Sequence, residues 1–171
     1  MMDMLNDPSM KEIVDGFCEE SIGLFSELEE ALEALEDDPS DTAQLETFGQ
    51  VIDRVMGAAK SIGAQDIANF CELGKVIGYK SSQSNDPALV EVVTAVLFDA
   101  VDLLNKMVKG IKDGNTDQTM KNLSPTAFIT RLRWLSDKFK DIERASCAID
   151  ETAETDLDQS SIDDLLSNLG L

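Results

Sequence analysis

The sequence predicts an all-α protein: an antiparallel bundle of four to five helices, followed by a flexible acidic linker and a C-terminal peptide helix. Three observations support this fold class. Apolar residues recur at steps of three and four through most of the chain, as they do on one face of an amphipathic helix. No segment shows the alternation of apolar and polar residues that is typical of a strand. Clusters of Gly, Pro, Asn and Asp separate the helical segments.

The first two predicted helices are joined by a short acidic connection. Residues 10–36 form the first helix, and Asp37-Asp38-Pro39 stops it. The second helix spans residues 45–63 and follows Ser40-Asp41-Thr42, where we expect a side chain to cap the exposed backbone N–H groups. One side of the second helix is apolar and should face the core. Its members are Leu45, Phe48, Ile52, Val55, Ala59 and Ile62.

Two further helices complete the predicted core. The third spans residues 64–82, and Gly74 and Gly78 on its inner side would let a neighbouring helix approach closely, although glycine lowers intrinsic helicity. The fourth follows a Ser-Asn-Asp-Pro start signal at 84–87 and runs to about Lys112. Its high apolar content makes it the central element of the predicted core.

The rest of the chain divides into three parts. A fifth helix is expected to start at Ser124-Pro125 and to belong to a bundle domain of residues 1–147. Residues 148–158 are acidic and nearly free of apolar side chains, which predicts a flexible linker. Residues 159–171 regain a helical pattern and form a separate C-terminal peptide.

Length and charge restrict the possible partners. The 171 residues, 43% of them apolar, suffice for one core. The formal charge of −20 argues against nucleic acid, because phosphate contacts need clustered Lys and Arg. We therefore expect a protein partner. No segment approaches the ~18 apolar residues of a membrane span, and the N-terminus has no targeting pattern, so we expect a cytoplasmic protein without membrane contact.

The sequence contains no histidine. This excludes a histidine phosphoacceptor, a Ser–His or Cys–His nucleophilic pair and histidine metal ligands within the chain. Cys18, Cys71 and Cys147 are too far apart for a CxxC metal site. Cys18 and Cys71 lie in apolar helical patterns, where we expect reduced core thiols. We predict no metal site and no cofactor of the chain's own.

The outer side of the second helix carries polar residues at helical spacing. Glu46, Gln50, Asp53 and Gly57 line up there. A carboxylate one turn from an amide, with a glycine that clears space beside them, could form a small site facing a docked partner. The same pattern also fits a solvated helix face, and the residues alone leave both interpretations open.

The C-terminal peptide has the pattern of a short helix that docks on another surface. Four apolar positions share one side of it, at i, i+3, i+4 and i+7. They are Ile162, Leu165, Leu166 and Leu169. Burying four such side chains yields roughly 8 kcal/mol before the cost of ordering the peptide, so weak binding and a tethering role are expected. Periodicity leaves open that the peptide folds back on its own bundle or pairs with a second copy.

The last residues, from Asp158 to Leu171, read DQSSIDDLLSNLGL. This order resembles the C-terminal peptide of the CheZ family of chemotaxis phosphatases, DQ-x-x-[VI]-DDLL-x-x-LG. In that family the peptide docks as a helix on the response regulator CheY. The resemblance implies six contact positions in this chain. They are Ile162, Asp163, Asp164, Leu165, Leu166 and Leu169.

The second helix also resembles CheZ, whose catalytic helix carries an acid-x-x-Gly-Gln pattern followed by Val-Ile. Here the stretch reads ETFGQVI from Glu46 to Ile52, with Glu in place of the family's usual Asp. The resemblance implies that Gln50 orients the water that attacks the regulator's aspartyl phosphate. Glu46 would fix the geometry through a lysine of the regulator. The required Mg²⁺ would belong to the regulator.

A second resemblance concerns the same helix. The stretch MGAAKSIGAQDIANFCELGKVIG, which starts at Met56, is similar to the segment around and after the phosphorylated histidine of histidine phosphotransfer (HPt) domains. Asp53 stands where the histidine would be and Met56 where the usual lysine would be, so phosphotransfer is not expected. Both resemblances place the same outer face against a receiver domain, with Asp53 and Gly57 as further partner-binding positions.

Three functions are therefore open. The first is a phosphatase of a CheY-like response regulator that acts through Gln50 and Glu46 and is tethered by its C-terminal helix. The second is a non-enzymatic, histidine-less HPt-like adaptor that binds the regulator without dephosphorylating it. The third is a helical scaffold whose tail mediates self-association. A homodimer is compatible with the resemblance to CheZ.

Overall fold

A computed structural model describes residues 4–116, and every regular element in this range is a helix. Two short 3-10 helices, η1 (Met4–Asn6) and η2 (Pro8–Met10), lead into four long α-helices. These are α1 (Lys11–Asp37), α2 (Ala43–Ser61), α3 (Gln65–Ser82) and α4 (Pro87–Lys112). The all-α class is confirmed for this part of the chain, whereas the predicted fifth helix, linker and C-terminal peptide helix lie outside it.

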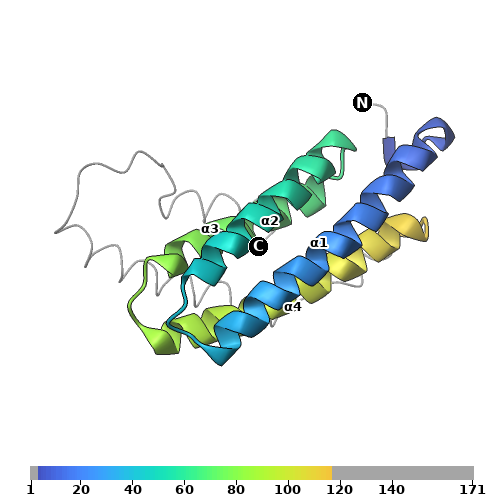
Figure 1. Cartoon of the computed structure of the whole chain (residues 1–171). Helices are drawn as coiled ribbons and strands as arrows, with labels where there is room; N and C mark the ends of the chain where they lie inside the picture. The colour runs from blue at the N-terminus through green and yellow to red at the C-terminus, as the bar shows by residue number, and fades with distance from the viewer. Residues whose placement is uncertain (1–3, 117–171) are drawn as a thin grey trace, which may run out of the picture.

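The four long helices form a bundle in which successive helices run in opposite directions (Figure 1). α1 packs against α2 and α4, and α3 packs against the same two helices. Apolar side chains of all four helices form one continuous core. Within residues 4–116, no helix combines the length and apolar character needed to cross a membrane.

The connection between α1 and α2 follows the predicted stop signal but not the predicted cap. α1 ends at Asp37, and the Asp38 carboxylate accepts hydrogen bonds from the Ser40 hydroxyl and backbone N–H at 2.6 and 3.0 Å, which hold the pKa of Asp38 below its usual value. The expectation that a side chain caps α2 is wrong, because Thr42 at its N-cap makes no side-chain hydrogen bond. The neighbouring Asp41 carboxylate instead accepts a hydrogen bond from the Gln44 amide at 3.0 Å.

The connection between α2 and α3 is the shortest in the bundle. Gly63 adopts a φ of +74°, in the left-handed region that glycine enters without steric cost. The backbone N–H of Ala64 then reaches back to the carbonyl of Ala59 at 2.9 Å, and α3 begins at Gln65. This tight reversal brings α3 directly alongside α2.

Two glycines of α3 allow the close approach that the sequence predicts. A Cβ atom added at Gly74 would lie 3.3 Å from Ile52 Cδ1, and one added at Gly78 would lie 3.5 Å from Phe48 Cδ1. The side chains of α2 therefore fill the space that these glycines leave open. This packing sets the register of α2 along α3.

Every residue of the predicted inner face of α2 is buried. α4 is buried over a wide arc of its surface, as its apolar content predicts.

Cys18 and Cys71 are both reduced and fully shielded from solvent. Burial raises the pKa of the Cys71 thiol to about 12 and also raises the pKa of Cys18. Both thiols therefore remain protonated at neutral pH and serve as small core residues.

The start of α4 offers a direct test of helix capping. The Asp86 carboxylate accepts hydrogen bonds from the backbone N–H groups of Ala88 and Leu89 at 3.0 and 3.4 Å, and Pro87 occupies the first helical position. We expect Asp86→Ala to lower the free energy of unfolding by about 1 kcal/mol, because two N–H groups lose their acceptor. Urea unfolding followed by circular dichroism measures this loss.

Asp113 at the other end of α4 is the matched control. Its side chain makes no hydrogen bond or ion pair with the residues described, and a carboxylate at a helix C-terminus interacts unfavourably with the helix dipole. Asp113→Ala should leave the unfolding midpoint unchanged or slightly higher. Equal losses for the two variants would contradict the capping role of Asp86.

Candidate functional site

The four predicted site residues of α2 share one exposed side of the helix. The opposite side of α2 packs into the core, so Glu46, Gln50, Asp53 and Gly57 all face outward. They extend over about 16 Å at 1.5 Å per residue. We call these four residues the α2 face. The structure thus brings together the part of the predicted site that lies in α2.

Glu46 and Gln50 stand one helical turn apart at the start of this face. Both are exposed, and across residues 4–116 neither side chain forms a hydrogen bond or an ion pair. Side chains four residues apart have Cβ atoms about 5–6 Å from each other, so a carboxylate and an amide are presented together. No intramolecular bond has to be broken before these two groups bind a partner.

Two glycines, one on the α2 face and one beside it, leave parts of the outer side of α2 without side chains. A Cβ atom added at Gly49 or at Gly57 would meet no neighbouring atom within 4 Å. These glycines are therefore not required for packing within the described bundle. Their lack of a side chain leaves room for the backbone of another protein to approach α2 beside Gln50 and beyond Asp53.

Asp53 differs from Glu46 and Gln50 because it is already engaged. Its Oδ1 atom lies 2.7 Å from Nζ of Lys75 on α3, and the side chains remain 48% and 40% exposed, respectively. Asp53 is therefore neither an isolated solvated carboxylate nor buried in the core. The ion pair joins the α2 face to the neighbouring helix and adds a cation to it.

Sequence reasoning missed Lys75 and also Tyr79, an exposed aromatic residue on α3. Tyr79 follows Gly78, the glycine of α3 that packs against Phe48. The pair of glycines in α3 marks the side of that helix that faces α2, but it does not give the register between the two helices. Once these glycines are placed against α2 in an antiparallel register, Lys75 falls beside Asp53.

The remaining bases of α2 and α3 are placed differently. Arg54 lies 3.7 Å from Glu27 of α1, on the flank away from α3. Lys80 is only 9% exposed. Lys60 is exposed, but ten residues separate it from Gln50, which corresponds to about 15 Å along the helix. Among these bases of α2 and α3, Lys75 is the one that pairs with a residue of the α2 face, Asp53, close to Gln50.

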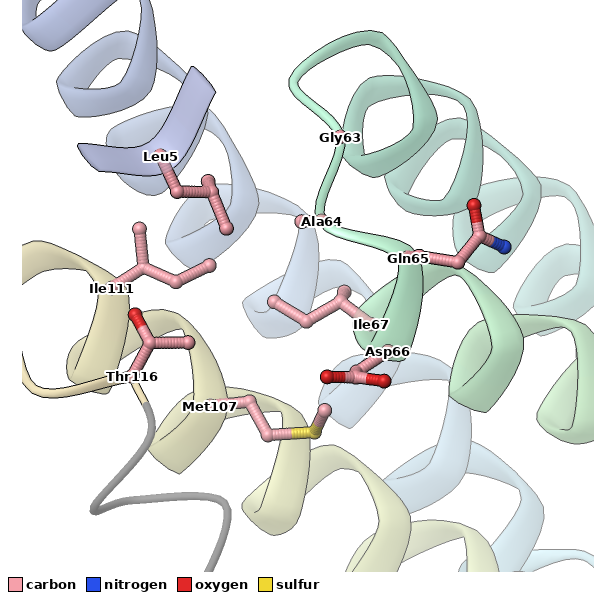
Figure 2. Close-up of a pocket in the computed structure, with 9 residues that line it drawn as sticks. All are labelled: Leu5, Gly63, Ala64, Gln65, Asp66, Ile67, Met107, Ile111 and Thr116. Carbon is pink, nitrogen blue, oxygen red and sulfur yellow. The ribbon is translucent and has the colours of Figure 1, made fainter. Parts of the chain in front are cut away.

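A small cavity lies at the end of the bundle where α2 turns into α3 and α4 ends (Figure 2). Its volume is about 120 Å³. Leu5, Ile67, Met107 and Ile111 supply apolar walls, and Asp66 and Thr116 supply polar atoms. None of the predicted site residues lines it. Among the described residues that line the cavity, Asp66 is the one carboxylate, and none is a Cys, Lys or Arg.

The contact positions predicted in the C-terminal peptide, from Ile162 to Leu169, lie outside the residues that the structure describes. In the described range, no group of three or more Cys, Asp or Glu residues could hold a metal ion. Comparisons with known protein families, with curated proteins and with solved structures find no match to this chain.

Proposed function

We propose that this protein stimulates the dephosphorylation of a CheY-like response regulator, with the α2 face acting on the aspartyl phosphate and the C-terminal peptide tethering the regulator. The observation that carries the proposal is the pair Glu46 and Gln50, exposed one turn apart with no bond to the described residues. The resemblance of both this pair and the tail to CheZ, in the same order along the chain, supports it.

The chemistry needs no histidine. An acyl phosphate already has a good leaving group, so an added amide can act by placing a water molecule in line with the bond that breaks. In the proposal, the Gln50 side chain forms a hydrogen bond with this water. Glu46 pairs with a lysine of the regulator and so fixes the regulator's orientation on α2. The Mg²⁺ that neutralises the phosphoryl group is the regulator's.

The second candidate is a histidine-less HPt-like adaptor that binds the regulator and leaves its phosphate intact. It is favoured by the Asp53–Lys75 pair in the middle of the α2 face, which offers both charges to a partner without a nucleophile. Neither candidate transfers a phosphoryl group, because the HPt resemblance implies that Asp53 stands where the phosphorylated histidine would be and the chain contains no histidine. The two candidates differ only in whether phosphate is released.

Phosphate release from a phosphorylated receiver domain separates these candidates. Each CheY-type receiver domain of the source organism is phosphorylated with acetyl phosphate and Mg²⁺, and its dephosphorylation is followed with and without the full chain. The phosphatase proposal requires faster release with at least one receiver, in proportion to the amount of chain added. If a receiver binds the chain but releases phosphate at its own rate, the adaptor is correct.

Truncation after Cys147 tests the tether. Removing residues 148–171 should raise the regulator concentration required for half-maximal stimulation by about 100-fold, because the linked peptide no longer raises the regulator's local concentration. The maximal rate should change little, since Gln50 is retained. Titration of the stimulated rate against regulator concentration measures both quantities.

A full-length chain with Leu165→Ser and Leu166→Ser is the matched control for the truncation. It keeps the length and charge of the tail but removes two apolar anchors of the docking helix. It should behave like the truncated chain. Unchanged half-maximal concentrations in both would show that the tail does not tether the regulator.

A further inference from the structure

We infer that Lys75 is the cation of this protein that binds the regulator's phosphoryl group, and that Asp53 is the positioning residue that holds the Lys75 ammonium for this purpose. The inference rests on the proposed function, because it assigns a role at the same site. The inference goes beyond the proposed function because it places a residue of a second helix, α3, in contact with the phosphoryl group.

The charges on the α2 face favour a cation beside Gln50. An aspartyl phosphate is strongly anionic, and the full chain carries a formal charge of −20. Glu46 and Asp53 flank Gln50 on the same side of α2. Like charges brought together at a docking site oppose association. The regulator's Mg²⁺ offsets part of the phosphoryl charge, and a positive group of this face would offset the repulsion that remains from its carboxylates.

Lys75 is the base best placed to meet the phosphoryl group. Helices α2 and α3 contain four bases, of which Arg54 lies near Glu27 of α1 and Lys80 is almost fully buried. Lys60 lies about 15 Å from Gln50 along the helix. Lys75 Nζ is 2.7 Å from Asp53, whose Cβ is about 5–6 Å from that of Gln50 because the two are three residues apart.

The geometry of the ion pair leaves the ammonium available. A lysine ammonium has three N–H donors, and the bond to Asp53 uses one of them. The Lys75 side chain is 40% exposed, so its other donors can reach phosphoryl oxygens from the outer side of α3. Asp53 restricts the rotamers of a long flexible side chain before the regulator docks. Asp53 thus favours, before docking, an orientation in which the Lys75 ammonium stands beside the α2 face.

The test compares Lys75→Ala, Lys75→Arg and the wild-type full chain. Binding is measured to one CheY-type receiver domain with Mg²⁺, with and without beryllofluoride, which occupies the place of the phosphoryl group. Lys75→Ala should lower affinity for the beryllofluoride form, and kcat/KM for phosphate release, by about 10- to 100-fold, the range for a hydrogen bond to a charged group. Affinity for the unmodified receiver should not change, and Lys75→Arg should retain most of the activity.

Lys106→Ala is the matched control. Lys106 forms an exposed Lys–Asp ion pair of the same length, 2.7 Å, with Asp102 one turn away on α4 and away from the α2 face. Its replacement should change neither affinity nor phosphate release. If Lys75→Ala also has no effect, or weakens both receiver forms equally, Lys75 does not bind the phosphoryl group and the inference is overturned.

A double-mutant cycle tests the role of Asp53. Asp53→Ala alone should lower affinity for the beryllofluoride form about threefold, because the ammonium is no longer held. In the Lys75→Ala background the same change should raise affinity, because it removes an unpaired carboxylate beside the anion. A loss of similar size in both backgrounds would show that Asp53 does not act through Lys75.

These experiments distinguish the inference from the proposed function. If the wild-type chain releases no phosphate but prefers the beryllofluoride form through Lys75, the phosphatase proposal fails and the inference stands. If the chain stimulates release without any dependence on Lys75, the proposal stands and the inference fails. A wild-type chain with no preference for the beryllofluoride form overturns the inference outright.

Discussion

Gln50→Ala is expected to lower the stimulated rate of regulator dephosphorylation on the order of 100-fold, the size of effect seen when one well-placed hydrogen-bonding group is lost from an active site. Binding of the regulator should be retained, because the tail and the rest of the α2 face are intact. Gln50 is exposed and bonds no described residue, so its removal should not unfold the bundle. Phosphate release at saturating regulator measures the effect.

Two further variants sharpen the result for Gln50. Gln50→Glu has almost the same shape but puts a negative charge beside the phosphoryl group, and should be as inactive as Gln50→Ala. Gln65→Ala is the control, since Gln65 is an exposed glutamine of α3 whose amide donates to Asn69 at 2.7 Å, outside the α2 face. It should retain full activity. Full stimulation by Gln50→Ala would remove Gln50 from the mechanism.

Phe48→Ala is expected to lower the free energy of unfolding by about 3–5 kcal/mol. The Phe48 ring is completely buried between α2 and α3. Its Cδ1 and Cε1 atoms lie 3.5 and 3.9 Å from the places where Gly78 and Gly74 would carry a Cβ atom. Because these two positions have no side chains, neither of them can fill the cavity that the missing ring leaves. Urea unfolding with a far-ultraviolet readout measures the loss.

Phe98→Ala is the control for the core substitution. Phe98 belongs to α4 and is only partly buried at the edge of the same core. Its replacement should cost clearly less, because solvent already reaches part of the ring and little new cavity forms. If both substitutions lowered the free energy of unfolding equally, the glycine-lined contact between α2 and α3 would contribute no more to stability than the edge of the core.

The helix boundaries could be predicted closely because local chemistry determines them. The first helix was expected over residues 10–36 and covers Lys11–Asp37, and the fourth starts at Pro87 and ends at Lys112 as expected. Acidic residues with proline, and glycine with asparagine, end or start a helix whatever it packs against. The predicted cap of α2 is wrong because the Ser40 hydroxyl donates to Asp38 and the Asp41 carboxylate accepts from Gln44, so neither side chain reaches the N–H groups at the start of the helix.

The burial of α3 was underestimated for a different reason. Its expected inner side is buried, but Phe70, Leu73 and Val76 are buried as well. Periodicity describes one face of one helix. It does not show that α3 is flanked by α2 on one side and α4 on the other, which depends on the order of helices around the bundle.

In the candidate site, too, the features within one helix could be predicted from the sequence, whereas a contact between two helices could not. The alignment of Glu46, Gln50, Asp53 and Gly57 follows from the helical repeat and was found from the sequence. The Asp53–Lys75 contact joins residues 22 positions apart on different helices. It depends on the register between those helices, which a pattern within one helix does not contain. The roles of these residues stay predictions that the experiments above test.

The glycines of α3 have a consequence for how the protein tolerates change. The Asp53–Lys75 bond spans the same gap between helices that Gly74 and Gly78 keep narrow. Any residue that widens this gap stretches a polar bond on the outside while it disturbs apolar contacts on the inside. A substitution at Gly74 that moved the two helices apart would therefore also lengthen the distance that the Asp53–Lys75 bond has to span.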